Sequence, residues 1–353
     1  MSVLVKFLQA YNGDSILVSF NSEKGVKNIL IDGGTGTTYS KNGRPGDLKK
    51  EIRRIAAEGQ SIDLLIITHI DDDHIGGILR MYSNKQFDNS LIKKVWFNSG
   101  RLISNMFEDE GEPLDRDIPL NRYSKLDTSV RQGATLEEYL KKGNSWVEEI
   151  IKQGKEYTLE GCKITVLSPN EKGLKKLNNR WQTERPLSLE ASPKQTDYHI
   201  SIEDLIKSED NFIEDNSIPN GSSIAILLTY NDCKILLLGD AHPNVITTYL
   251  KEQGFTSANP LRLDLLKLSH HASKKNTNDE LLNLVDCDTF VTLTNGLKHG
   301  LPDKVTFARI IKNKPGCKLL FNYNLPRIVF TKKELNEMRF EATFLNRQEL
   351  KLT

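Results

Sequence analysis

The chain has 353 residues, of which 38% are hydrophobic and 27% charged, a composition typical of a soluble globular protein. Its 48 Lys and Arg residues nearly balance its 47 Asp and Glu residues, and the formal charge of +1 excludes a net basic field that would hold duplex nucleic acid. The N-terminus lacks the features of a secretory signal, and no window reaches the roughly 18 apolar residues of a membrane-spanning helix. We therefore expect a cytoplasmic protein that does not contact a membrane, with its four widely spaced cysteines as buried free thiols.

The first hundred residues predict strands around one amphipathic helix. Short β-branched runs at 3–20 and 27–32 flank the turn FNSEKG and indicate a hairpin. A helix is expected over about 46–58, where apolar residues recur at helical spacing among charged ones. The strongly apolar run at 62–69 is typical of a strand buried on both faces. This run leads into the segment THIDDDHIGG.

A polar, charge-rich stretch at about 101–219 separates the first half of the chain from the second. It shows little periodicity apart from a predicted helix at 134–154 and a predicted hairpin at 156–168. We interpret this stretch as a large insertion over one face of the domain.

The second half, at about 220–330, again alternates strands with helices. The expected elements are, in chain order, a strand pair at 222–240, a helix at 243–253, a strand at 263–271, a helix at 279–284, a strand at 289–296 and a helix at 303–312. With the first half at 1–100, this order predicts a single α/β layered domain over residues 1–330. Residues 331–353 would form a C-terminal extension, in which KKELNEMRF fits either a turn of helix or an extra strand.

Four side chains that bind divalent metals follow the first buried strand within six residues, namely His69, Asp71, Asp73 and His74. The loop after a rigid strand can hold such ligands without disturbing the core. Four ligands can serve two ions, and water that bridges two ions is a strong nucleophile near neutral pH. The alternative interpretation is a solvated acidic turn with incidental histidines.

Further ligand-type residues recur where later strands are expected to end. The chain has only seven histidines, and the candidates beyond the acidic turn are Asp240, His270, His271 and His299. Because the carboxyl ends of parallel strands meet at one edge of a sheet, these residues are expected to lie near the acidic turn.

Seven segments of the chain form an ordered series, which reads NGDSILVSF, LIDGG, THIDDDHIGG, NGSSIAILL, LLLGDA, LKLSHHASK and KHGLP. This series resembles the metallo-β-lactamase fold hydrolases, most closely the branch typified by the hydrolase domain of the DNA-uptake protein ComEC. The resemblance spans residues 3–312 and leaves out the insertion. It implies a metallo-β-lactamase-like four-layer αββα sandwich built from two αβ halves.

By this resemblance, two divalent ions, Zn²⁺ or Mn²⁺, would lie in a cleft between the two halves. Their ligands would be His69, Asp71, Asp73, His74 and, as the bridge between the ions, Asp240. The doublet His270–His271 occupies the place of the family's last metal histidine; His270 is favoured, and His271 remains open. Asp32 and Asp14 would orient a metal histidine from outside the ligand set.

Two positions depart from the family's usual ligands. Asp71 stands where many members carry histidine, and Asn220 stands where the family often has a further histidine. Asn220 is therefore also a candidate ligand. Oxygens would replace imidazoles at the first ion, which favours Mn²⁺ or partial occupancy there.

The resemblance also implies substrate contacts beside the metals. Ser273 and Lys274 are similar to the branch's HHGSK and would contact a phosphate, although a solvated loop is the alternative for Lys274. His299 in KHGLP would act as a general acid or as a phosphate contact. The candidate catalytic residues are Asp73, Lys274 and His299.

These features together predict a bacterial metal-dependent phosphodiesterase or nuclease that uses a metal-bound hydroxide at a dinuclear site. Its substrate would be a nucleic acid or a nucleotide, and the insertion is a candidate docking surface for a protein partner. One alternative is hydrolysis of a carbonyl ester, lactone or thioester on the same fold. The other is a non-catalytic regulatory subunit of a defence or DNA-processing complex.

Overall fold

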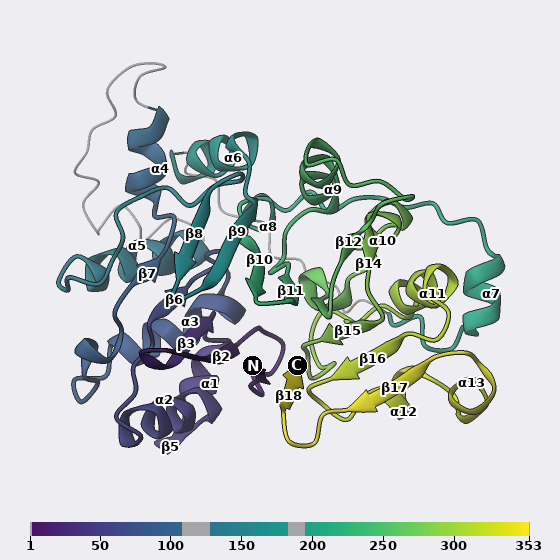
Figure 1. Cartoon of the computed structure of the whole chain (residues 1–353), viewed down its shortest axis with the longest axis horizontal. Helices are drawn as coiled ribbons and strands as arrows, with labels where there is room; N and C mark the ends of the chain where they lie inside the picture. The colour runs from purple at the N-terminus through teal and green to yellow at the C-terminus, as the bar shows by residue number, and fades with distance from the viewer. Residues whose placement is uncertain (1, 108–127, 183–194, 353) are drawn as a thin grey trace.

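The computed structural model describes residues 2–107, 128–182 and 195–352, which form two packed β-sheets with helices on the outer face of each (Figure 1). The six-stranded sheet has the order β18 (Glu349–Leu352), β1 (Val3–Phe7), β2 (Ile16–Ser22), β3 (Gly25–Ile31), β6 (Leu64–Ile66) and β7 (Val95–Trp96). The eight-stranded sheet has the order β17 (Glu341–Phe344), β16 (Lys318–Phe321), β15 (Thr289–Thr292), β13 (Leu265–Lys267), β11 (Cys233–Leu237), β10 (Ala225–Tyr230), β9 (Cys162–Ser168) and β8 (Glu156–Leu159). Two small pairs join β4 (Ser40–Lys41) to β5 (Arg44–Pro45) and β12 (Leu261–Arg262) to β14 (Val285–Asp286).

The central strands of both sheets are buried on both faces, because their side chains alternate between two cores, whereas the edge strands β8, β17 and β18 are partly exposed. In β6, Leu64 and Ile66 pack in the core between the sheets, whereas Leu65 packs under the helices of the first half. In β13, Leu265 faces the core between the sheets and Leu266 faces the helices of the second half. The result is a four-layer αββα arrangement, as predicted, and it is consistent with the metallo-β-lactamase fold.

Amphipathic helices form the two outer layers. Ile52 of α2 and Ile78 of α3 pack on the first sheet, and Ile246 of α9 and Phe307 of α11 pack on the second. The helices are α1 (Gly36–Tyr39), α2 (Asp47–Ala57), α3 (Asp72–Tyr82), α4 (Gly100–Phe107), α5 (Thr128–Leu140), α6 (Glu171–Gln182), α7 (Ile202–Lys207), α8 (Ile218–Gly221), α9 (Pro243–Glu252), α10 (Asp279–Leu284), α11 (Lys304–Asn313), α12 (Pro326–Val329) and α13 (Lys332–Glu337). Within the described ranges, no helix has the length and apolar character needed to cross a bilayer.

The predicted helix at 134–154 is confirmed over 134–140 and is wrong beyond Leu140. Helix α5 ends at Leu140, Gly143 follows it, and Trp146 then pairs with Val95 in an extended bridge. Glycine is a poor helix former, and the bridge holds the chain after it in an extended form. Part of the insertion at 101–219, namely 108–127 and 183–194, lies outside the described residues. The predicted hairpin at 156–168 forms β8 and β9, which make one edge of the eight-stranded sheet.

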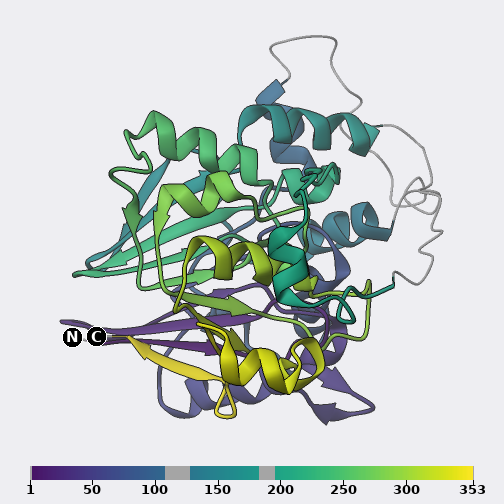
Figure 2. The same cartoon turned by 90° about the vertical axis from the view of Figure 1, so that its right-hand side faces the viewer.

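The C-terminal residues complete both sheets. The segment KKELNEMRF forms the turn of helix, α13, and not a strand; β17 on the second sheet and β18 on the first follow it. Figure 2 shows β18 in yellow beside β1 in purple, with the two chain ends together. The four cysteines are buried free thiols, which confirms that prediction.

Candidate metal centre

Strands from both sheets end at one place and deliver ligand-type side chains to it. Asp32 follows β3, His69 follows β6, and Asp240 follows β11. The doublet His270–His271 follows β13 in a short 3₁₀ turn. Helix α3 begins at Asp72, so Asp73 and His74 lie in its first turn. The strands predicted at 62–69, 263–271 and 289–296 are shorter than expected, because the chain leaves the sheet to form these loops.

The ligand atoms form three close groups that share His74, and within each group they lie within 4.8 Å of one another. One group contains His69, His74 and Asp240, and another contains Asp73, His74 and His271; the third contains Asp14, Asp32 and His74. Asp240 belongs to the first group and also lies close to His271 of the second. Its Oδ1 is 3.4 Å from Nε2 of His74, and its Oδ2 is 3.9 Å from Nε2 of both His69 and His271.

Several of these atoms are buried without a hydrogen-bond partner. They are Nε2 of His69, His74 and His271, and Oδ1 of Asp240. Buried polar atoms in proteins normally have a partner, so a cluster of unpartnered imidazole nitrogens around a carboxylate needs an explanation. Imidazole and carboxylate are ligands that divalent transition metals prefer, and these residues therefore fit a metal ion.

Hydrogen bonds at Nδ1 of His74 and His271 orient these rings so that their Nε2 atoms point toward the centre. Nδ1 of His74 donates to Oδ2 of Asp32 at 2.7 Å, and Asp32 also accepts from the hydroxyl of Thr68 at 2.6 Å. Nδ1 of His271 donates to the carbonyl oxygen of Leu293 at 2.8 Å and lies 3.3 Å from Oδ1 of Asp14. Such partners fix the tautomer and orientation of a metal-binding imidazole.

The pKa values of these groups reflect burial and crowded charge. Burial, together with the charge of His74, lowers the pKa of His69 to about 4. Burial and the neighbouring carboxylate of Asp73 raise the pKa of Asp71 to about 6. Burial would lower the pKa of His271, but Asp240 and the other carboxylates outweigh it and raise the pKa to about 10. The site therefore concentrates negative charge that a cation would neutralise.

The two histidines of the doublet lie differently. His271 is buried and belongs to the group with Asp73 and His74. His270, which the sequence favoured, has a side chain 29% exposed, and its Nε2 lies 4.0 Å from Oδ2 of Asp240. Nδ1 of His270 donates to Oδ1 of Asn276 at 3.1 Å. Both histidines therefore face Asp240, but His271 lies among the closest ligand atoms.

The remaining predicted metal residues lie on the side of His69 and His270. Oδ2 of Asp71 is 3.7 Å from Nε2 of His69, while its Oδ1 accepts from the hydroxyl of Ser129 at 2.9 Å. The side-chain amide of Asn220 donates to Oδ2 of Asp215 at 2.7 Å, and its nitrogen lies 3.4 Å from Nδ1 of His270. Asn220 thus lies next to the predicted centre but outside the close groups.

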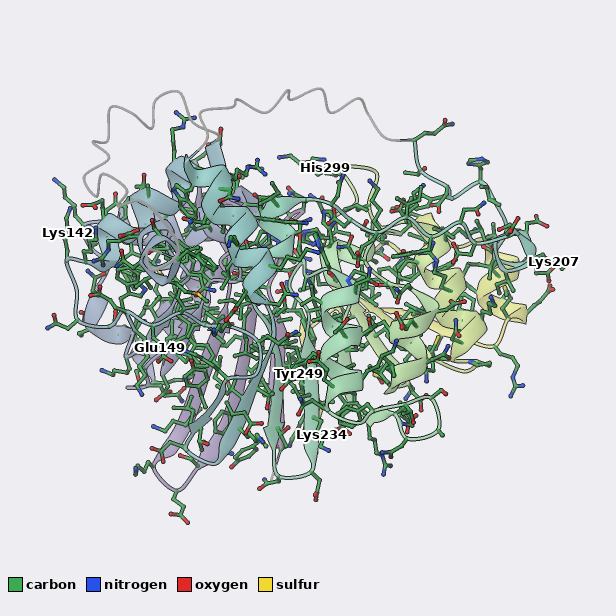
Figure 3. The ribbon with its side chains drawn as sticks, turned by 90° about the horizontal axis from the view of Figure 1, so that it is seen from above. Lys142, Glu149, Lys207, Lys234, Tyr249 and His299 are labelled. Atoms are coloured by element: carbon green, nitrogen blue, oxygen red, sulfur yellow. The ribbon has the colours of Figure 1, made fainter. Side chains whose placement is uncertain are left out.

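The predicted substrate residues lie further out. Ser273 is buried, and its hydroxyl accepts from the backbone N–H of Lys275 at 3.3 Å. The side chain of Lys274 is exposed, and its backbone N–H donates to Asp303 at 2.8 Å. His299 is exposed between the two halves of the molecule (Figure 3), and the charges of Asp73, His270 and His271 all act on its pKa. His299 therefore lies near enough to these groups for their charges to act on it, but outside the close ligand groups.

Sequence reasoning missed two charged residues that support the centre. Lys267 is fully buried; it pairs with Oδ2 of Asp14, and its Nζ lies 3.9 Å from Oδ1 of Asp240. A lysine inside the apolar run LLKLS was the available signal. The other residue is Asp215, whose Oδ2 lies 3.4 Å from Nδ1 of His270 and accepts from Asn276 at 3.1 Å. Its place within the insertion offered no signal.

We expect Asp215→Asn to weaken metal binding at the side of the centre next to His270 by about 10- to 100-fold. Burial alone would raise the pKa of Asp215, but His270 and Asn220 hold it below its usual value, so the carboxylate is ionised. The amide cannot provide that charge. Titration of metal-stripped protein with Mn²⁺ measures the effect. Glu214→Gln, one position earlier, is the matched control, because the carboxylate of Glu214 accepts from Asn244 and not from a residue of the centre. Equal affinities of the two variants would show that Asp215 has no such role.

Comparison with known proteins shows that part of the chain is similar to one protein superfamily. Residues 10–138 match the metallo-beta-lactamase superfamily. No curated protein sequence matches the chain. Among matching solved structures is the metallo-beta-lactamase fold protein YhfI from Bacillus subtilis, which is 12% identical over 97% of this chain and 95% of that one, with a TM-score of 0.41.

A second matching structure is CmlA, a diiron beta-hydroxylase from Streptomyces venezuelae. It is 10% identical, with a TM-score of 0.39, over 99% of this chain and 54% of that one, so this chain spans about half of its length. At these identities and TM-scores, neither protein indicates what this chain binds. The matched residues 10–138 make up less than half of the chain and include the whole THIDDDHIGG turn, and the αββα fold is consistent with that superfamily.

Proposed function

We propose that this protein is a metal-dependent phosphodiesterase, acting on a nucleic acid or nucleotide, and that it is related to the ComEC-type branch of the superfamily. The observation that carries the proposal is the pair of close ligand groups that contain His69 and His271, which share His74 and are linked by Asp240, a member of the first group that also lies close to His271 of the second. Divalent ions held at such a pair of sites supply Lewis acidity to both the attacking and the leaving oxygen of a phosphodiester.

The ligand residues would be divided between two ion positions. His69 and Asp71 would help to hold one ion and Asp73 and His271 the other, with Asp240 close to both pairs. Nδ1 of His74 donates to Asp32, so Nε2 of His74 would serve one of the two ions. The outer partners Asp32 and Asp14 keep the imidazoles in place, which limits the reorganisation needed during the reaction.

Cationic and neutral polar groups at the mouth of the site favour a phosphate over a carbonyl substrate. Burial lowers the pKa of His299, so its ring is neutral at pH 7 and can donate one N–H to a phosphate oxygen. The exposed side chains of Lys274 and Lys275 follow the His270–His271 doublet and add positive charge at the same loop. We propose that these residues orient the phosphodiester at the ligand groups.

The test is hydrolysis of bis-p-nitrophenyl phosphate, and of single-stranded and duplex DNA and RNA, by metal-stripped protein supplied with Zn²⁺, Mn²⁺ or Mg²⁺ in turn. Turnover of a phosphodiester that is lost in Asp73→Ala supports the proposal. Turnover confined to a lactone, thioester or carboxylic ester would replace it with the carbonyl alternative. Absence of all turnover in protein that binds metal would point to a regulatory subunit.

A further inference from the structure

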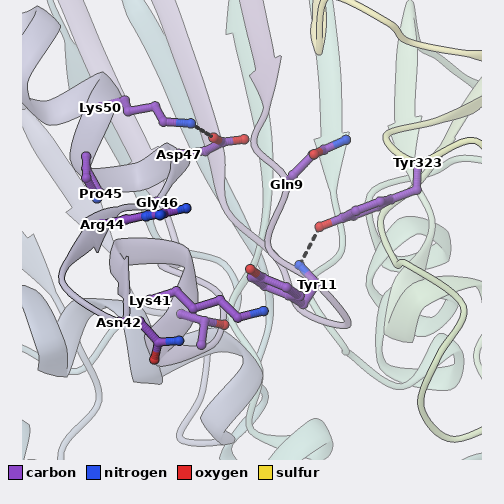
Figure 4. A pocket seen from close by; sticks show the side chains of 11 residues that line it. Gln9, Tyr11, Lys41, Asn42, Arg44, Pro45, Gly46, Asp47, Lys50 and Tyr323 are labelled. Carbon is purple, nitrogen blue, oxygen red and sulfur yellow. Dashed lines mark hydrogen bonds and ion pairs between the residues drawn. The ribbon is translucent and has the colours of Figure 1, made fainter.

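A pocket of about 620 Å³ lies between the first and second halves of the molecule. Figure 4 shows two tyrosines on one side of it and the β4–β5 hairpin with the first turn of α2 on the other. The lining residues that matter here are Tyr11, Lys41, Arg44, Asp47, Lys50 and Tyr323. Nothing described above assigns a role to this pocket.

Positive charge outweighs negative charge on the hairpin side of the pocket. Lys41 and Arg44 are exposed, and among the described residues Arg44 has no ion-pair partner. The one lining carboxylate, Asp47, already pairs with Lys50 at 2.8 Å. Lys41 and Arg44 therefore remain available for an anion.

Aromatic surface lines the opposite side. The backbone N–H of Tyr11 donates to the hydroxyl of Tyr323 at 2.7 Å, which fixes the two residues against each other. Nζ of Lys41 lies 5.3 Å from the centre of the Tyr11 ring, so a cation and an aromatic face meet inside the pocket. This combination suits a ligand that carries both a flat ring and a phosphate.

The pocket lies on the same sheet edge as the metal centre. β13, β15 and β16 are parallel neighbours, and at their carboxyl ends they carry His271, the loop with His299, and Tyr323 in turn. With strands spaced about 4.8 Å apart, two steps place the end of β16 roughly 10 Å from the end of β13. The loop that holds Tyr11 also touches the centre, since the side chain of Asn12 donates to Oδ2 of Asp73 at 2.9 Å.

We propose that this pocket binds a nucleotide unit of a single-stranded nucleic acid next to the phosphodiester at the metal centre, a step that rests on the proposed function. Lys41 and Arg44 contact the phosphate of that unit, and its base lies against Tyr11 and Tyr323. A base inside a duplex is stacked and cannot enter such a pocket, so the pocket selects single strands.

The test compares the wild-type protein with the double variant Lys41→Ala/Arg44→Ala and with Arg53→Ala as a matched control. Arg53 is exposed on α2 but does not line the pocket. Anisotropy of a fluorescein-labelled oligothymidylate measures binding over a range of salt concentrations, and steady-state kinetics measure KM for the oligonucleotide and for bis-p-nitrophenyl phosphate.

We expect the double variant to bind the oligonucleotide about tenfold more weakly. The log–log slope of affinity against salt concentration should be smaller by roughly 0.7 for each phosphate that Lys41 and Arg44 no longer neutralise. KM should rise at least fivefold more for the oligonucleotide than for bis-p-nitrophenyl phosphate, which has no nucleoside. Arg53→Ala should bind like the wild type.

The outcomes separate this inference from the proposed function. Turnover of bis-p-nitrophenyl phosphate with equal oligonucleotide affinity in all three proteins would reject the pocket and keep the phosphodiesterase. Oligonucleotide binding that is lost in the double variant, without turnover of any substrate, would keep the pocket and reject the phosphodiesterase. Binding of a duplex as tightly as of a single strand would also overturn the inference.

Discussion

Asp73→Ala is expected to lower phosphodiester hydrolysis by about a thousandfold or more while the protein keeps its fold. Oδ2 of Asp73 lies 3.6 Å from Nε2 of His271 and accepts from the side chain of Asn12, so the variant loses a member of the second ligand group. Loss of one ion would remove several kcal/mol of transition-state stabilisation, and each 1.36 kcal/mol is tenfold in rate. The rate with saturating Mn²⁺ or Zn²⁺ is the measurement.

The neighbouring residue offers a close control for this variant. Asp72 lies in the same turn of α3, but its side chain is exposed and accepts from Gln132 instead of facing the centre. Asp72→Ala should hydrolyse the substrate like the wild type. An undiminished rate in Asp73→Ala would contradict the ligand role. Unfolding of that variant, seen by circular dichroism, would contradict the view that a ligand in the first turn of α3 contributes little to the core.

Lys267→Met is expected to lower the free energy of unfolding by about 3–5 kcal/mol. The ammonium group is fully buried, donates to the carbonyl oxygen of Gly239 at 2.9 Å and pairs with Asp14. Methionine fills a similar space but leaves the carboxylate of Asp14 without its partner, and a buried unpaired charge is costly. Urea unfolding of the full chain, in the same metal conditions for each protein, measures the change.

The effect should depend on pH in one direction. Burial would raise the pKa of Asp14, but Lys267 and His271 outweigh it and hold the pKa below its usual value. In the wild type, the stability that comes from ionised Asp14 is present above the pKa of unfolded aspartate and is lost as the pH falls through the lowered pKa of the folded state. The variant lacks this contribution, so its deficit should be greatest near neutral pH and should shrink in acid.

Two further variants make the Lys267 experiment decisive. Lys94→Met, at an exposed position, should change stability little. The double variant Lys267→Met/Asp14→Asn removes both charges and should be more stable than Lys267→Met alone. If the double variant were less stable than the single variant, packing and not charge would explain the loss.

The main ligand loops could be predicted from the sequence because local chemistry and strand geometry agree there. His69 and His74 belong to the acidic turn, which directly follows an apolar run that predicts a buried strand. Asp240 and the His270–His271 doublet follow similar apolar strands, and parallel strands deliver their carboxyl ends to one edge. The four layers followed from the alternation of strands with amphipathic helices.

Other parts of the site depend on contacts that local patterns do not encode. Tyr11 and Tyr323 are 312 residues apart, and only the packing of the two halves brings them to one pocket. Asp215 reaches His270 from an extended segment without periodicity. The doublet could not be resolved from spacing, because both histidines adopt positive φ and point to different partners.

The strands β13 and β15 are shorter than predicted, and the reason is again a contact that local patterns do not encode. Leu268 and Leu293 continue the apolar runs of β13 and β15 and are fully buried, so composition extends both strands toward the site. Strand β13 instead ends at Lys267 and β15 at Thr292. Residues beyond these ends contact side chains of the centre; for example, the carbonyl oxygen of Leu293 accepts from Nδ1 of His271.

The central claim is that the two ligand groups that Asp240 links, one with His69 and the other with His271, hold two divalent ions. The most direct test is the metal content of the purified chain, measured by plasma mass spectrometry after loading with Mn²⁺ or Zn²⁺ and removal of free metal. We expect about two ions per chain in the wild type and in Asp72→Ala, and one or none in Asp240→Ala. A wild-type protein that retains no ion under any loading condition, or an Asp240→Ala variant that retains two, would contradict the claim.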